Sequence, residues 1–128
     1  MTLSDPQVAA LARQAVELLG PDIAITIEPA PSHDPYGFGV TAWLVYPVID
    51  RRPESGLHVD STMSPARALA QLLDGLGEHI GETERFRGRA FPPCPAGHEH
   101  PADVVLEDDA VLLRCPSGGG TSRIEPAA

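Results

Sequence analysis

The chain contains no lysine and no asparagine, and only 5% of its residues are aromatic. All nine basic residues are therefore arginines, while 18 residues are acidic, so the formal net charge is −9 at pH 7. A chain of this charge repels phosphate backbones unless its arginines gather on one face. We therefore do not expect nucleic acid as a partner.

Long apolar runs are also missing. No stretch approaches the roughly 18 consecutive apolar residues that a membrane helix needs. The first residues, MTLSDPQVAALARQ, do not show the basic region followed by an apolar run that marks a secretory signal. We therefore expect a cytoplasmic protein that does not enter a membrane.

The chain has only two cysteines, Cys94 and Cys115, and both lie near its end. Two cysteines can form one disulfide, as in many secreted proteins, or can bind a metal ion. His98 and His100 lie between them, and we find no export signal. These two observations favour metal over a disulfide.

Residues 1–81 show the patterns of two helices and three strands. The first helix is expected to begin after Ser4 or Asp5 and to end at Gly20, and the second to begin at Ser64-Pro65 and to end at Gly81. Alternating residues predict strands at 23–27, at about 38–46 and at 57–60. The strand at 38–46 is apolar on both faces, so we expect it to be central. Together these elements predict an α+β fold with a small antiparallel sheet.

We divide the chain into an α/β core at 1–81, a charged linker at 82–90 and a separate module at 91–128. The linker contains Arg85, Arg87 and Arg89, which we interpret as a solvated surface. In the module, two short apolar segments flank an acidic turn at 107–110, a pattern typical of a β-hairpin. Such a hairpin would return Cys115 to the neighbourhood of Cys94.

The predicted metal ligands are Cys94, His98, His100 and Cys115, and the predicted ion is Zn²⁺. Thiolates and imidazoles are the usual ligands of structural zinc, which is held by four of them in a tetrahedron. Pro95-Ala96-Gly97 predicts a tight turn that brings His98 back toward Cys94.

Two cysteine-bearing turns joined by a short hairpin resemble a zinc ribbon, and this resemblance covers about 91–124. Zinc ribbons carry paired ligands in each turn, whereas the turn after Cys115 offers only one. The fourth ligand could therefore be His100, water, Glu99, a distant histidine (His33 or His58), or a group from another chain. The chain as a whole resembles small actinobacterial proteins with a C-terminal CPxxH metal module, a resemblance that implies no particular activity.

These features lead to the hypothesis of an acidic, zinc-stabilised interaction or adaptor protein that binds another protein or pairs with itself through a sheet edge. Two alternatives stay open. A small zinc hydrolase would keep an open metal position and use Glu99 or His58 as a base. An immunity-like inhibitor would block a basic active site with its negative surface. The HExxH and G-x-S-x-G motifs are absent, and we assign no catalytic residue.

Overall fold

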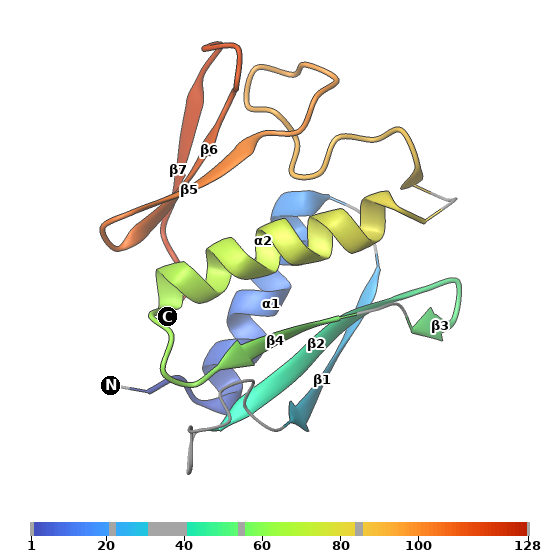
Figure 1. Cartoon of the computed structure of the whole chain (residues 1–128), viewed down its shortest axis with the longest axis vertical. Coiled ribbons are helices and arrows are strands. Elements are labelled where there is room, and N and C mark those ends of the chain that lie inside the picture. Colours follow the sequence, from blue (N-terminus) through green and yellow to red (C-terminus); the bar gives the residue numbers. More distant parts are fainter. Residues whose placement is uncertain (1, 21–22, 31–40, 54–55, 84–85, 128) are drawn as a thin grey trace.

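The computed structural model describes residues 2–20, 23–30, 41–53, 56–83 and 86–127. Within these ranges the chain forms two helices and two antiparallel sheets (Figure 1). The predicted α+β class is therefore confirmed. No helix in these ranges is long and apolar enough to cross a membrane.

The first sheet is built around β2, which confirms the expected central strand. β2 pairs with β1 on one side and with β3 and β4 on the other. The strands are β1 (Ala24–Ala30), β2 (Ala42–Ile49), β3 (Arg52–Pro53) and β4 (Leu57–Asp60). β2 continues past the predicted end at Tyr46 to Ile49, and residues 38–40 of the predicted strand lie outside the described residues. It ends at Asp50 and Arg51, whose φ angles of 52° and 67° are those of a tight hairpin turn.

Both helices begin where their capping residues predict. In α1 (Asp5–Leu19), the Ser4 side chain accepts a hydrogen bond from the amide of Gln7, and the Gln7 side chain accepts one from the amide of Ser4. In α2 (Pro65–Gly81), the Ser64 hydroxyl accepts from the amide of Arg67. Each helix buries one apolar stripe.

Two glycines that weaken α2 as a helix allow close packing around it. A Cβ on Gly75 would lie 2.9 Å from Cδ1 of Leu57, and a Cβ on Gly77 would lie 3.2 Å from the carbonyl oxygen of Phe91. These positions therefore let β4 and the chain after the helix approach its surface. The low helix propensity of glycine is offset by this contact.

The second sheet consists of β5 (Asp103–Glu107), β6 (Ala110–Arg114) and β7 (Thr121–Ile124), with β6 in the middle. The predicted hairpin is confirmed, and it turns at Asp108, whose φ is 52°. The sequence patterns predicted no strand at Thr121 and Ser122. Both belong to β7, which pairs with β6 along its whole length.

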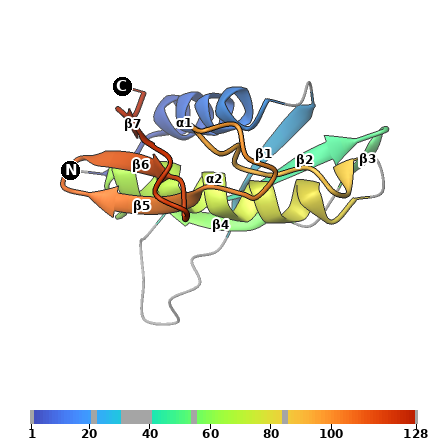
Figure 2. The ribbon, with the colours of Figure 1, turned by 90° about the horizontal axis from the view of Figure 1, so that it is seen from above.

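α2 lies between the two sheets (Figures 1 and 2). The first sheet covers one side of the two helices, and β5 and β6 pack against α2 from the other side. One buried cluster joins all three layers. It includes Val45 and Val59 from the first sheet, Leu72 and Leu73 from α2, and Val111 and Leu113 from the second sheet.

The chain between α2 and the second sheet is anchored by Phe86, which is only 4% exposed. The Phe86 ring meets the Phe91 ring edge to face at 5.9 Å, and the guanidinium of Arg89 lies 5.6 Å from its centroid. Arg87 is exposed, and Arg85 lies outside the described residues. The division of the chain at 82–90 stays a prediction.

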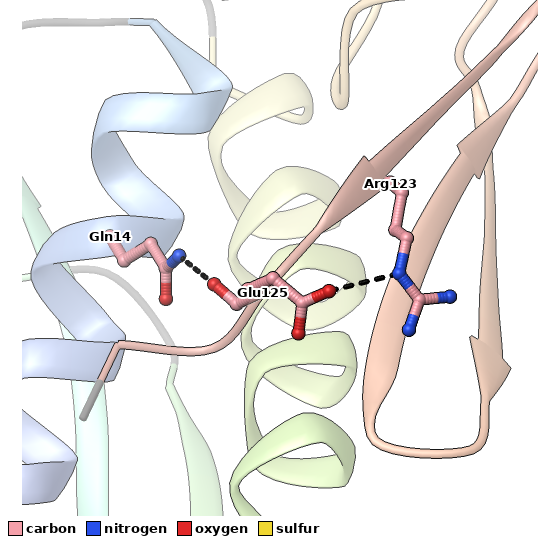
Figure 3. Close-up of polar contacts among 3 residues, drawn as sticks. All are labelled: Gln14, Arg123 and Glu125. Carbon is pink, nitrogen blue, oxygen red and sulfur yellow. Dashed lines mark hydrogen bonds and ion pairs between the residues drawn. The ribbon is translucent and has the colours of Figure 1, made fainter.

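The end of the chain is fastened to α1 by one side chain (Figure 3). The Gln14 amide nitrogen donates to the backbone carbonyl of Glu125 at 2.7 Å, and its carbonyl oxygen accepts from the amide of Ala127 at 2.7 Å. Arg123 forms an exposed ion pair with the Glu125 carboxylate at 2.9 Å. The Gln14 side chain therefore donates one hydrogen bond to the backbone of the tail and accepts one from it, the pattern that a paired strand would provide.

Candidate metal centre

Two similar turns form the site, and each begins with a cysteine. The amide of Gly97 donates to the carbonyl of Cys94 at 2.9 Å, and the amide of Gly118 donates to the carbonyl of Cys115 at 3.0 Å. Both glycines have left-handed φ angles, 77° and 79°, which glycine adopts without strain. The sequences Cys-Pro-Ala-Gly and Cys-Pro-Ser-Gly therefore fold in the same way.

The second sheet positions these turns. Cys115 directly follows β6, and its amide donates to the carbonyl of Gly120 at 2.9 Å, which closes the turn between β6 and β7. The amide of Ala102 donates to the carbonyl of Pro92 at 2.9 Å, which closes the loop that carries the other three predicted ligands just before β5. The two loops lie side by side at one end of the molecule (Figure 1).

The structure brings together all four predicted ligands. One ligand atom from each of Cys94, His98, His100 and Cys115 lies within 4.8 Å of the other three. Among the described residues this is the only such group of three or more histidine, cysteine or acidic side chains. Both cysteines are buried and neither forms a disulfide, whereas His98 is exposed and His100 is half-buried.

The separations between these atoms are compatible with a metal ion such as zinc. Sγ of Cys115 lies 3.4 Å from Nδ1 of His98 and 3.9 Å from Nε2 of His100, and the two nitrogens are 3.1 Å apart. A tetrahedral zinc ion with bonds of about 2.0 Å to nitrogen and 2.3 Å to sulfur holds its ligands about 3.3 to 3.8 Å apart. The residues therefore fit a Cys2His2 ion site.

The two histidines reach the same point although only one residue separates them, because they use different ring nitrogens. His98 presents Nδ1 and His100 presents Nε2. Nδ1 of His100 lies 3.3 Å from the carbonyl oxygen of Pro101. A proton on that Nδ1 can be donated to this carbonyl, and it leaves Nε2 free as a ligand.

The surroundings of Cys115 favour its thiolate. Burial of the sulfur raises the pKa, but hydrogen bonds from the amide of Gly119, the Cys94 side chain, the amide of Ser117 and the His98 ring outweigh it and lower the pKa to about 6. The sulfur therefore carries a negative charge at neutral pH, as a metal ligand must.

Gly119 explains why the second turn supplies only one ligand. It stands where His98 stands in the first turn, four residues after the cysteine. A Cβ on Gly119 would lie 2.9 Å from Cβ of Ala96 and 3.2 Å from Sγ of Cys115. A side chain at this position would have to displace these atoms, and the fourth ligand atom of the group belongs to His100 instead. The Cys-Pro-x-Gly sequence occurs twice in the chain. Aligning the two copies would have shown that Gly119 replaces the histidine of the first copy.

Two other candidates for the fourth ligand, Glu99 and His58, are not part of the group. Glu99 is exposed and His58 lies on β4. His33 lies outside the described residues. His58 and Asp60 instead line a separate cavity of about 470 Å³, where the Gln71 amide donates to the backbone carbonyl of His58.

No protein-family model, curated protein or solved structure matches this chain.

Proposed function

We propose that this is a zinc-stabilised interaction protein, in which a closed Cys2His2 site stabilises the C-terminal ribbon, residues 91–124. The convergence of four ligand atoms within 4.8 Å carries the proposal. Four protein ligands complete the coordination that structural zinc prefers, whereas a catalytic zinc ion keeps one place for water. The arrangement thus supports a structural ion over the hydrolase alternative.

The outer end of the ribbon needs such an ion, because it has almost no core of its own. Residues 95–99 and 116–119 are all exposed, and the buried side chains there are chiefly the two cysteines themselves. Short segments with so little apolar burial depend on a staple such as a metal. Binding zinc would then contribute directly to the stability of this end.

The first test is whether the purified chain binds one zinc ion. We expect native mass spectrometry to show one equivalent of zinc, which a strong chelator removes. Proteolysis should then cut the loops at 94–101 and 115–120 before the helices. Cys94→Ser should reproduce this pattern without chelator. A metal-free chain that resists protease equally well would contradict the proposal.

We propose that the interaction surface is the free edge of β1. Within the described residues β1 pairs only with β2. Ile25 lies opposite Pro47, and Pro29 lies opposite Trp43. Because proline has no N–H, these must be the pairs that exchange no hydrogen bonds. By the same alternation, the backbone N–H and C=O groups of Ile25 and Ile27 point away from β2.

A groove lined mainly by apolar side chains runs beside this edge of β1. Ile23, Ile25 and Ile27 are half-buried and, together with Ala9 and Val16 of α1, line a groove of about 420 Å³. Among the described residues of this lining only Arg13 is charged, and it is exposed, so its guanidinium can stay in water. Apolar side chains beside free backbone donors are suited to an added strand.

The partner we propose is a second copy of the chain. An antiparallel pair that places Ile25 opposite Ile27 of the other copy forms its central hydrogen bonds from isoleucine donors alone. Pro29 then falls opposite Ile23, which lies just outside β1. The isoleucines of both copies would then form one apolar strip on the helix side of a continuous sheet.

The test is the molar mass in solution. We expect light scattering after size exclusion to give the mass of a dimer for the native chain and of a monomer for Ile27→Pro, which removes a free-edge donor but no bond to β2. Leu106→Asp is the matched control on the edge strand β5, where Leu106 is 45% exposed, and it should remain dimeric. A monomeric native chain would refute the dimer while leaving the zinc site untouched.

A further inference from the structure

The chain has two cysteines, and the predicted zinc site uses both. Their sulfurs are unbonded and lie within 4.8 Å of each other. Each cysteine opens a Cys-Pro-x-Gly turn, and the two turns face each other from separate loops. Within the chain, each sulfur therefore has one thiol partner, which is already close.

We propose that Cys94 and Cys115 are also an oxidative modification site, at which hydrogen peroxide or a related hydroperoxide converts the thiolate pair into a disulfide and expels the zinc ion. This proposal rests on the proposed function, because the ion must first be bound.

The step balances as a two-electron oxidation. One thiolate attacks the peroxide and the O–O bond breaks, and the second thiolate displaces the resulting hydroxyl from the first sulfur. The S–S bond forms between Cys94 and Cys115 while both Zn–S bonds break. Two thiolates, one hydrogen peroxide and two protons give one disulfide and two waters, and Zn²⁺ leaves without changing its oxidation state.

Because only two of the four ligands are thiolates, formation of one disulfide is enough to release the zinc ion. A site with four thiolates would keep two after one disulfide forms, but this site keeps none. Only the imidazoles of His98 and His100 remain, and His98 is exposed to water. Two neutral nitrogens without a thiolate do not make the four-ligand site of structural zinc, so the ion dissociates.

The peroxide must reach two buried sulfurs, because Cys94 is only 6% exposed and Cys115 only 2% exposed. His98 is exposed and His100 is half-buried, so the histidines are the more accessible members of the group and we expect the peroxide to enter beside them. After oxidation the disulfide joins the same two turns that the ion joined, so we expect the folded ribbon to persist.

The experiment uses the full zinc-loaded chain, treated with hydrogen peroxide. Zinc release is followed with a chromogenic chelator, and intact mass is measured after the metal is stripped in acid. We expect one zinc released for each chain that loses two hydrogen atoms in mass, and dithiothreitol with added zinc should restore the original state. Zinc in the untreated chain is measured first, so its absence would count against the proposed function and not be confused with resistance to oxidation.

Three outcomes would overturn the proposal. The first is retention of zinc, with both thiols still reactive after peroxide has oxidised a free-thiol control peptide. The second is loss of zinc from a chain that gains oxygen atoms and forms no disulfide. The third is a disulfide between two chains, seen on a non-reducing gel. Cys94→Ser is the control, since its single thiol should gain oxygen atoms and form no bond within the chain.

Discussion

Gly119 faces the imidazole of His98 so closely that a Cβ on Gly119 would lie 3.2 Å from Cε1 of the ring. The two Cys-Pro-x-Gly turns are alike in hydrogen bonding, but only one has room for a ligand at its next position. The absence of a side chain at Gly119 therefore shapes the site as much as the four ligand side chains do.

Gly119→Ala should weaken zinc binding by roughly 10-fold to 100-fold, the usual effect of disturbing a group just outside the ligands. The new methyl group would displace the His98 ring and the amide that donates to Cys115. Competition with a chelating dye of known affinity measures the change. Gly75→Ala is the matched control, because its Cβ would press on Leu57 at 2.9 Å, away from the site. Equal zinc affinity in both variants would show that Gly119 has no such role.

Removing either ligand histidine should cost more zinc affinity than Gly119→Ala does. We expect His98→Ala and His100→Ala each to weaken binding more than roughly 100-fold, since a ligand matters more than its outer partners. His79→Ala, in the last turn of α2, serves as the control and should bind zinc normally. If His100→Ala binds as tightly as the native chain, the fourth ligand is something else.

Much of the fold was readable from local signals. Ser4 and Ser64 mark where the helices begin, and the prolines that follow them strengthen both signals. β7 was missed for a physical reason. Its four residues are mostly polar and follow three glycines, so it has little strand propensity of its own and forms by pairing with β6.

The grouping of Cys94, His98, His100 and Cys115 was predictable, because two cysteines and two histidines close together in sequence are typical of a metal site. Which nitrogen each histidine presents could not be predicted, since it depends on the Pro101 carbonyl and on ring orientation. The packing role of Gly75 and Gly77 was equally hidden, because it depends on Leu57 and Phe91, which are distant in sequence.

The low pKa of Cys115 predicts an early onset of thiol reactivity in the metal-free chains whose two Cys-Pro-x-Gly turns stay closed. Iodoacetamide modification of Cys115, followed by peptide mass spectrometry, should rise as the pH climbs through about 6. In urea the midpoint should return to about 8.5, the value of a free thiol. Because folding lowers this pKa, the stability it contributes is complete above the unfolded pKa and is lost as the pH falls through about 6. A midpoint above 8 in the folded chain would refute the assigned environment.

Gln14→Ala should release the tail. The substitution removes both hydrogen bonds to the chain end and should lower the free energy of unfolding by about 1–2 kcal/mol. Hydrogen exchange at the amide of Ala127 should accelerate, which a peptide-resolved experiment would detect. Arg123→Ala is the control, because its ion pair with Glu125 is solvent-exposed and should contribute little.

The central feature of the proposed structure is one zinc ion held by two sulfurs and two nitrogens. X-ray absorption at the zinc edge of the zinc-loaded chain measures this set directly. We predict two sulfur neighbours at about 2.3 Å and two nitrogen neighbours at about 2.0 Å, in a tetrahedron. A shell with fewer than two sulfurs, or with a water oxygen in place of one imidazole, would contradict the closed Cys2His2 site.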